Sequence, residues 1–233
     1  MKLKITLTVC SIMILTACVF GTNGSGNVTT ETRTLEKFTG IQLKSVANVY
    51  ITQGEKQEVK IEAEDNLLKH IITEIKNDEL IIDCEENIHF NSQVNVYITT
   101  PDLNLLELSG SGNMMTKNTI NSSRLTLRLD GSGEMKVAMK SETLKTSLSG
   151  SGNLDMKGSA AESTIRISGS GNVNAQELKT FTSSVSISGS GNSKVDVNNE
   201  LNVNITGSGN VLYVTEPAKI TTKITGTGEV QKI

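Results

Sequence analysis

The chain has 233 residues, a formal net charge of −3 and only 3% aromatic residues. The slight excess of acidic side chains argues against a nucleic-acid-binding protein, because such proteins present a basic face to the phosphates. With so few aromatic rings, any core must be filled mainly by Leu, Ile, Val and Met.

The first eighteen residues have the features of a lipoprotein export signal. A positive start with two lysines precedes a mostly apolar stretch over residues 5–15, and Leu-Thr-Ala-Cys follows at residues 15–18. The apolar stretch, about 11 residues, is too short for a membrane-spanning helix, which needs about 20. The last four residues resemble the lipobox of bacterial lipoproteins, whose cysteine thiol takes the lipid. We therefore predict a signal peptide over residues 1–17 and lipidation of Cys18; the alternative is an ordinary signal peptide with an incidental cysteine.

Residues 18–32 are polar and rich in glycine, and we interpret them as a flexible tether between the lipid and the folded body. Loss of the signal peptide removes two lysines and leaves a net charge near −5. With the signal peptide removed and Cys18 lipidated, Cys84 is the one free cysteine, so no disulfide is expected within the chain. We interpret Cys84 as an inert buried thiol at the end of a strand.

A short motif recurs through the second half of the chain. A Gly-Ser-Gly or Gly-Thr-Gly triplet begins every 18 to 21 residues, at Gly110, Gly131, Gly150, Gly169, Gly189, Gly207 and Gly226. The last glycines of the triplets are Gly112, Gly133, Gly152, Gly171, Gly191, Gly209 and Gly228. Apolar and polar residues alternate on both sides of each triplet, and this period of two predicts β-strands.

The glycines predict sharp corners between these strands. Glycine adopts positive φ without the steric cost that a Cβ carries, and a corner stacked about 4.8 Å from its copies leaves little room for side chains. The residue after the triplet is asparagine in most repeats, with Glu134 and Glu229 as exceptions. We predict that these asparagines stack as an amide ladder and form a candidate ligand-facing row: Asn113, Asn153, Asn172, Asn192 and Asn210.

Two folds fit this pattern. In a parallel β-solenoid each repeat is one coil, and the triplet is the corner between two sheets. In a chain of antiparallel hairpins the triplet is a three-residue loop. Near-identical repeats favour the solenoid, because stacking places like residues on like and buries a continuous apolar row. We therefore predict an all-β protein, a parallel β-solenoid (β-helix) with coils of about 19 residues and regular repeats over residues 101–233.

Residues 33–100 are less regular and are assigned to the same domain, which then covers residues 33–233. Strands are expected at residues 38–43, 48–52, 58–63, 79–83 and 93–99. Residues 65–75 have an N-cap candidate and helical spacing, which predict a short helix over one end of the solenoid. The other end, residues 228–233, has no obvious cap. Because an open last strand invites pairing with another chain, we expect a homo-oligomer.

The chain lacks the residue pattern of a recognisable active site. We interpret His70 and His89 as surface or satisfied side chains rather than as ligands. The carboxylates of the repeats form no cluster that recurs from coil to coil: Asp130, Glu134, Asp155, Glu177, Asp196, Glu200 and Glu229. Polysaccharide cleavage needs two convergent carboxylates or bound calcium. We therefore predict no catalytic residues, no metal site and no cofactor.

With the lipobox, the glycine corners and a block over residues 38–54, the sequence resembles the auto-transporter adhesin head GIN domain family over about residues 30–230. The resemblance implies a right-handed β-helix found in lipoproteins of Gram-negative, often gut-dwelling bacteria. It also implies an adhesin role and no known catalytic residues. One departure is residues 44–47, where relatives tend to carry another glycine corner.

Together these features predict an exported protein that is lipid-anchored in the cell envelope, at the outer membrane. Its expected function is that of an adhesin or surface binding module for a glycan or a surface protein, without catalytic activity. One alternative is an envelope scaffold, assembled with other proteins or with its own copies. Another is a carbohydrate-active enzyme, because elongated β-solenoids host polysaccharide lyases and hydrolases.

Overall fold

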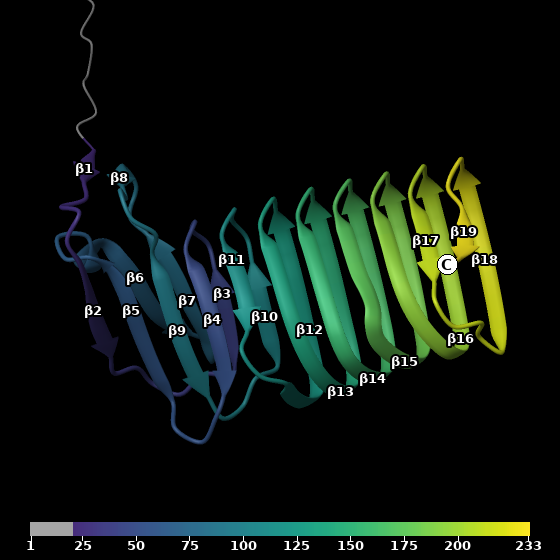
Figure 1. Ribbon diagram of the computed structural model, residues 1–233, viewed down its shortest axis with the longest axis horizontal. Coiled ribbons are helices and arrows are strands. Elements are labelled where there is room, and N and C mark those ends of the chain that lie inside the picture. Colours follow the sequence, from purple (N-terminus) through teal and green to yellow (C-terminus); the bar gives the residue numbers. More distant parts are fainter. Residues whose placement is uncertain (1–20) are drawn as a thin grey trace, which may run out of the picture.

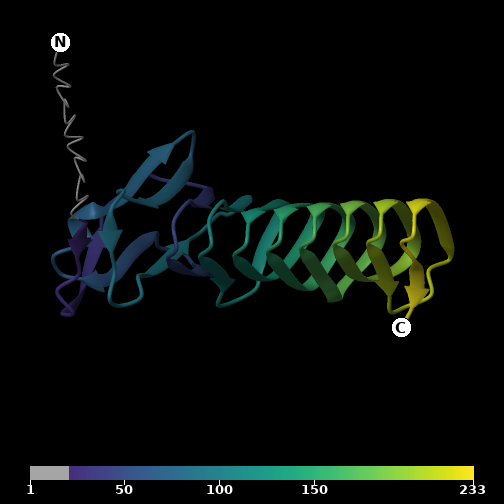
Figure 2. The ribbon, with the colours of Figure 1, turned by 90° about the horizontal axis from the view of Figure 1, so that it is seen from above.

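A computed structural model describes residues 21–233 as an elongated stack of β-strands that run across its long axis (Figure 1). The beginning of the described chain and its C-terminus lie at opposite ends of the stack (Figures 1 and 2). The predicted signal peptide and Cys18 lie outside the described residues. No helix within residues 21–233 is both long enough and apolar enough to cross a membrane.

The C-terminal half consists of coils that each pass through two sheets. A long strand begins just after one glycine triplet, bends near its middle and ends at the next triplet (Figure 2). The strands of this half are β10 (Leu105–Leu108), β11 (Asn113–Thr116), β12 (Ile120–Gly131), β13 (Glu134–Gly150), β14 (Asn153–Gly169), β15 (Asn172–Gly189), β16 (Asn192–Gly207), β17 (Asn210–Tyr213), β18 (Lys219–Gly226) and β19 (Val230–Lys232).

Neighbouring coils pair in parallel, and each corner glycine lies beside the corner glycine of the next coil. Gly131 is the partner of Gly150, and Gly150 is the partner of Gly169. A chain of hairpins would pair these strands in antiparallel fashion. The parallel β-solenoid predicted from the repeats is therefore confirmed, with like residues stacked on like along the axis.

The solenoid has two faces, named here by their position relative to the triplet. The first face is the sheet that follows each triplet, and the second face is the sheet that precedes it. Alternate side chains of both sheets point inward, as Leu154 and Met156 do on the first face and Ile165 and Ile167 on the second. These four side chains are at most 2% exposed. Aliphatic and methionine side chains thus fill the interior.

The N-terminal part adds two further coils and a cap of antiparallel strands. Its elements are β1 (Thr22–Asn23), β2 (Val28–Arg33), β3 (Gly40–Leu43), β4 (Asn48–Gln53), β5 (Glu58–Glu64), the 3-10 helix η1 (Leu68–His70), β6 (Ile71–Lys76), β7 (Glu79–Cys84), β8 (Ile88–His89) and β9 (Asn95–Thr100). The coil of β3 and β4 lies between the coil of β7 and β9 on one side and the coil of β10 and β11 on the other. Antiparallel pairs β2–β5, β5–β9 and β6–β7 close this end of the stack.

The prediction of a short helix over residues 65–75 is wrong. Only Leu68–His70 form a single 3-10 turn, and Ile71–Lys76 form strand β6. Three isoleucines and a threonine in β6 favour a strand, since β-branched side chains pack well on a pleated surface. The antiparallel partner β7 supplies the hydrogen bonds that decide between the two conformations.

The prediction of a flexible tether over residues 18–32 is also wrong for residues 21–32, the part of it that the structure describes. Val28–Arg33 form β2, which pairs with β5. The fully buried carboxylate of Glu64 accepts hydrogen bonds from the backbone N–H groups of Gly26 (2.7 Å), Asn91 (2.9 Å) and Ser92 (3.4 Å). The composition of residues 18–32 indicated a linker. The strand β5 and the Glu64 carboxylate that hold residues 26–33 in place come from a distant part of the sequence.

The first corner has no glycine triplet and still keeps the register. Leu43 lies beside Leu108, and Asn48 lies beside Asn113. Residues 44–47 therefore span the same corner as the four residues that separate Leu108 from Asn113. None of residues 44–47 has a positive φ. This corner consequently does not require glycine.

Candidate ligand-binding face

The asparagines that follow the triplets stand in a row on the first face, next to the corners. Asn172 Nδ2 donates to Asn153 Oδ1 at 3.2 Å, and Asn192 Nδ2 donates to Asn172 Oδ1 at 3.1 Å. Asn210 Nδ2 continues the row with a bond of 3.0 Å to Asn192 Oδ1. Each amide nitrogen carries two N–H groups. Asn172, Asn192 and Asn210 therefore each keep one N–H group that this row does not use.

A second run of stacked asparagines lies towards the N-terminus, separated from the first by Glu134, which stands in register between Asn113 and Asn153. It includes two asparagines that sequence reasoning did not predict. Asn113 Nδ2 donates to Asn48 Oδ1 at 2.9 Å, and Asn48 Nδ2 donates to Asn95 Oδ1 at 3.0 Å. A signal for these two extra rungs was present: the pentapeptide Asn-Val-Tyr-Ile-Thr occurs at residues 48–52 and again at 95–99. The two copies lie side by side in register on strands β4 and β9.

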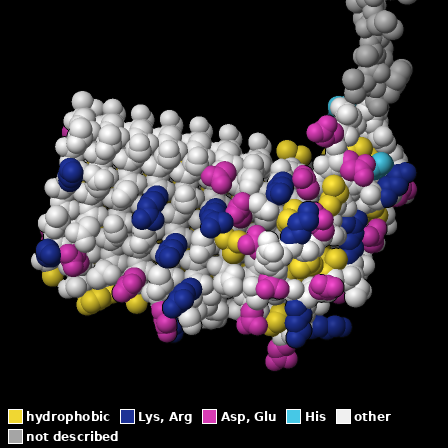
Figure 3. Space-filling view, turned by 180° about the vertical axis from the view of Figure 1, so that it is seen from behind, with side chains coloured by type: hydrophobic (Ala, Val, Ile, Leu, Met, Phe, Trp, Pro, Cys, Tyr) yellow, Lys and Arg dark blue, Asp and Glu magenta, His cyan; other side chains and the backbone are white. Residues whose placement is uncertain are grey.

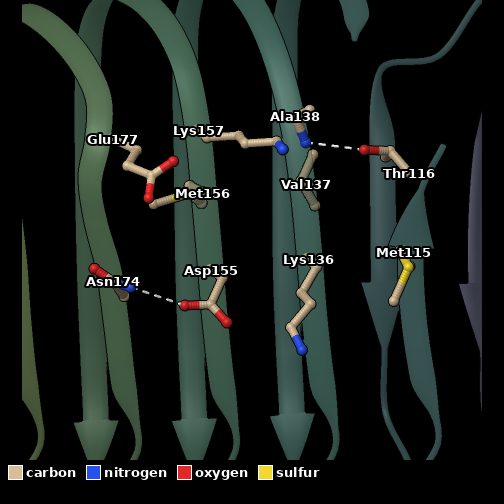
Figure 4. A pocket seen from close by; sticks show the side chains of 10 residues that line it. All are labelled: Met115, Thr116, Lys136, Val137, Ala138, Asp155, Met156, Lys157, Asn174 and Glu177. Carbon is tan, nitrogen blue, oxygen red and sulfur yellow. Dashed lines mark hydrogen bonds between the residues drawn. The ribbon is translucent and has the colours of Figure 1, made fainter. Parts of the chain in front are cut away.

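Beside the ladder, the first face is hollowed across β13, β14 and β15 (Figure 4). This hollow, called here the central hollow, has a volume of about 340 Å³. Two ammonium groups, two carboxylates and an amide surround an apolar floor. Convergent polar groups over an apolar floor are typical of ligand sites. The lining residues are Met115, Thr116, Lys136, Val137, Ala138, Asp155, Met156, Lys157, Asn174 and Glu177.

An irregularity of the coils builds one wall of the central hollow. The register between β14 and β15 shifts between Asp155 and Lys157, and the register between β15 and β16 shifts between Ala175 and Lys179. Strand β15 has 18 residues, against 17 in β14 and 16 in β16. The insertion places the exposed Glu177 beside Lys157. Bulges of this kind are over-represented next to functional sites.

The charges around the central hollow are only partly paired. Lys136 Nζ lies 2.9 Å from Glu134 Oε1, and this hydrogen bond, together with the charge of Glu134, raises the pKa of Lys136. Asp155 accepts a hydrogen bond of 3.0 Å from Asn174 Nδ2. No salt bridge within residues 21–233 involves Lys157. Its side chain extends across the hollow from β14 towards β13 (Figure 4) and is available to a ligand.

The recessed surface continues in both directions along the first face. Towards the C-terminus a second hollow of about 520 Å³ shares Asn174 with the central hollow. Towards the N-terminus the rings of Tyr50 and Tyr97 stack with centroids 5.2 Å apart, and Lys117 Nζ lies 4.0 Å from the centroid of Tyr50. Tyr50 is the register partner of Met115, which lines the central hollow. The first face thus offers aromatic, charged and amide groups along one line.

The second face carries rows of small hydroxyl and amide side chains instead. Its shallow depression has a volume of about 310 Å³ and is lined by hydroxyl, amide and aliphatic side chains, with Arg166 as its one charged residue. Seen from behind, hydrophobic side chains gather over the N-terminal part, whereas Lys and Arg side chains are scattered over both halves (Figure 3). The first face alone combines paired ammonium and carboxylate groups with an apolar floor in one hollow, which favours it as the place where a ligand is recognised.

Of the carboxylates in the repeats, the structure brings Asp155 and Glu177 to one hollow and leaves the others apart from it. His70 Nδ1 lies 2.7 Å from Glu85 Oε2 in the cap, and His89 is exposed on β8. Across residues 21–233 no group of three or more His, Cys, Asp or Glu side chains is arranged to hold a metal ion.

Stacked parallel coils, corner glycines and side-chain rows along the axis define a β-solenoid protein that displays an extended polar face. The family described as "Putative auto-transporter adhesin, head GIN domain" matches residues 37–217. The chain belongs to this family, as the sequence resemblance predicted. Among curated proteins none matches the chain.

Several solved structures share the fold. A putative adhesin from Bacteroides fragilis NCTC 9343 has a TM-score of 0.85 and 21% identity, covering 91% of this chain and 100% of its own. A putative lipid binding protein from Parabacteroides distasonis ATCC 8503 has a TM-score of 0.77 and 20% identity, with 91% and 98% covered. A putative adhesin from Parabacteroides merdae ATCC 43184 has a TM-score of 0.75 and 22% identity, with the same coverage.

Proposed function

We propose that this protein is a non-catalytic adhesin of the cell envelope, anchored by lipid on Cys18, which binds a glycan along its first face. The family description and the names of the solved structures with this fold, putative adhesins from Bacteroides fragilis and Parabacteroides merdae, support the adhesin role. The sequence motif at residues 15–18 supports the anchor.

The central hollow carries the glycan assignment. Lys157 and Lys136 offer N–H donors, whereas Asp155 and Glu177 offer acceptors, so that neither sign of charge is in excess. A neutral, hydroxyl-rich ligand uses donors and acceptors together, because each hydroxyl both donates and accepts. A polyanion would require a clear surplus of cations. The unused N–H groups of the asparagine ladder add donors along the edge of the same surface.

The anchor and the folded body are close together in this arrangement. Only two residues separate Cys18 from Gly21, the first described residue, and three steps of extended chain span roughly 10 Å. A lipid on Cys18 would therefore keep the N-terminal cap near the membrane. Strands β13 to β15, whose residues line the central hollow, and the C-terminal coil lie further along the stack (Figure 1).

One relative of the same fold is described as a putative lipid binding protein. Enclosing an acyl chain would require an apolar cavity between the sheets. In residues 21–233 the inward rows are occupied by closely buried side chains, such as Leu129 and Leu148 of adjacent coils. We therefore favour a glycan bound on the outer surface over a lipid enclosed in the interior.

The decisive experiment is binding of the purified chain over residues 21–233 to a broad glycan array, with released sugar measured in parallel. We expect selective binding without product. Lys157→Ala should weaken that binding by about tenfold, the equivalent of one hydrogen bond to a charged group. Lys145→Ala is the matched control, since Lys145 is also exposed but lies on the second face.

Three results would overturn the proposal. Absence of binding to every glycan would transfer the assignment to a protein partner or a scaffold. Equal loss from Lys157→Ala and Lys145→Ala would show that the central hollow is not the site. Release of sugar that stops when Asp155 or Glu177 is replaced would make the protein an enzyme.

The anchor has its own test in cells. Cys18→Ala should abolish labelling with a fatty-acid probe and move the protein from the membrane fraction to the soluble fraction. Retention of label and membrane association in this variant would exclude lipidation at Cys18.

A further inference from the structure

The second hollow of the first face differs from the central hollow in the hydrogen-bonding groups that it offers. It has a volume of about 520 Å³ and is lined by residues of β15, β16, β17 and the last coil. Two outward rows of side chains form its surface, the asparagine row beside the corners and the row two residues further along each strand. Val173 and Leu212 add apolar contacts to these polar rows.

The asparagine row offers this hollow a surplus of donors, because each of its amide oxygens already accepts a hydrogen bond. Asn172 Oδ1 accepts one from Asn192, and Asn192 Oδ1 accepts one from Asn210. Asn210 Oδ1 accepts the backbone N–H of Glu229 at 3.0 Å. Each of the three amides keeps one N–H group outside the ladder. A ligand that meets this row must therefore present acceptors.

Lys194 adds a positive charge beside these free N–H groups. It lies two residues after Asn192 on β16, and its register partners are Asn174 on β15 and Leu212 on β17. Its side chain is exposed, and no salt bridge within residues 21–233 involves it. Hydrogen bonds to an ionised acceptor are roughly twice as strong as neutral ones. A cation without a counter-ion beside unused donors thus favours a negatively charged acceptor.

The hollow suits one negative charge rather than many. Glu229 is the one carboxylate that lines it, and its coil is the second one after the coil of Lys194. Two coil spacings are about 10 Å, and salt at about 0.1 M screens exposed charges that far apart. A single carboxylate bound at Lys194 is therefore compatible with Glu229, whereas a densely charged polymer would meet it directly.

We propose that the second hollow is a subsite for an acidic sugar, whose carboxylate is bound by Lys194 Nζ and by the free amide N–H groups of Asn192 and Asn210. A peptide carboxylate has the same chemistry, but the two hollows share Asn174, whose Nδ2 donates to Asp155 Oδ1 at 3.0 Å (Figure 4). One glycan chain can therefore occupy both. The inference rests on the proposed function and specifies its ligand: an acidic sugar in the second hollow, joined to a neutral sugar in the central hollow.

The test measures binding of the chain over residues 21–233 to three glycans that join an acidic sugar to a neutral one. These are hyaluronan, glucuronoxylan and a sialylated mucin-type glycan, each compared with its carboxyl-reduced form. We expect at least one of them to bind about tenfold more tightly than its reduced form, the equivalent of one hydrogen bond between charged groups.

Variants of Lys194 assign this difference to the second hollow. Lys194→Met should remove it, because methionine keeps much of the apolar stem and lacks the charge, and Lys194→Arg should retain it. Lys145→Met, on the exposed surface of the second face, is the matched control and should bind like the natural chain. The gain from the carboxylate should also shrink as the salt concentration rises.

The outcomes separate this inference from the proposed function. Binding of neutral glycans without any gain from a carboxylate would overturn the acidic subsite and leave the glycan-binding function standing. Equal loss from Lys194→Met on the carboxylated and the reduced form would do the same. Absence of binding to every glycan would overturn both. Binding of a glutamate-rich peptide in place of any glycan, abolished by Lys194→Met, would assign the second hollow to a protein partner.

Discussion

Among the buried side-chain oxygens of residues 21–233 that have no hydrogen-bond partner are the hydroxyls of the buried residues Ser163, Ser183 and Ser193. An unsatisfied hydroxyl of this kind costs about 1–3 kcal/mol. Ser193 belongs to an inward row in which its neighbours on the adjacent coils are Val173 and Val211. The row is aliphatic on both sides of this position, so the serine is a local weakness in the core.

Ser193→Val should raise the free energy of unfolding by about 1 kcal/mol, because it removes the unsatisfied hydroxyl and extends the valine row. Chemical denaturation of the chain over residues 21–233 measures this change. Ser188→Val, on the exposed surface of the second face, should leave stability within about 0.5 kcal/mol. Loss of stability in Ser193→Val would show that the coils have no room for the one methyl group that valine adds beyond the position of the hydroxyl.

Glu64 is a second residue whose role is decided by its surroundings. Burial alone raises the pKa of its carboxyl, but hydrogen bonds from the backbone N–H groups of Gly26, Asn91 and Ser92 outweigh burial, so the pKa lies below the ordinary glutamate value. A pKa lowered by folding stabilises the folded state above the pKa of the unfolded chain. That stabilisation is lost as the pH falls through the folded pKa.

Glu64→Gln should therefore lower the melting temperature at neutral pH and loosen residues 21–33, which would exchange their amide hydrogens faster. The difference from the natural chain should shrink on acidification below the usual glutamate range. Glu58→Gln, on the exposed side of the same strand, is the control and should not change exchange in residues 21–33. A difference in melting temperature that is constant across pH would contradict the assigned role of the Glu64 charge.

At the scale of the element, the corners are the parts of the coil that tolerate least change. Gly150 has φ of +109°, and a Cβ at this position would lie 2.6 Å from the carbonyl oxygen of Gly131 on the preceding coil. Both the backbone conformation and the stacking distance therefore require glycine. The sequence predicted glycine at the corners because of positive φ and close stacking, and both conditions are met at Gly150.

Gly150→Ala should destabilise the chain by about 1–3 kcal/mol, since the alanine must either strain φ or push the coils apart. Thermal unfolding followed by circular dichroism measures the loss. Ser151→Ala, at the exposed middle of the same triplet, keeps the backbone bond to Gly131 and should change little. If both variants melted alike, crowding between stacked corners would not be the cause.

The elements also show where sequence patterns reach their limit. Alternation beside recurring triplets predicted every coil of the regular half, because the same local signal is repeated and each copy pairs with the next. Residues 65–75 gave a single short pattern without a copy, and the strand-forming partner of β6 was not visible in it. The two outer rungs of the ladder, Asn48 and Asn95, were missed for a related reason, since their coils lie outside the triplet repeat.

At the scale of the whole molecule, the two ends differ. Antiparallel strands close the N-terminal end, whereas the last coil pairs with one neighbouring coil only within residues 21–233. In a solenoid each coil is stabilised mainly by its neighbours, so a coil with one neighbour opens more readily than one with two. The asymmetry should therefore be visible in the dynamics of the chain.

Amide hydrogen exchange should be fastest in β18 and β19 and slowest in β13 to β15. Exchange measured by mass spectrometry tests this order. Uniform protection along the stack would contradict the weaker stabilisation of a coil that has one neighbour.

The sequence by itself determined the β-solenoid, its repeat, its corner glycines and its aliphatic interior. Each of these depends on one coil meeting a near-copy of itself, so the local pattern already contains the contact. Only the tertiary structure decided the order of the first coils, the fate of residues 21–33 and the central hollow. These depend on Glu64, on the bulge at Glu177 and on contacts between segments without sequence similarity, where the partner of each residue is set by the fold.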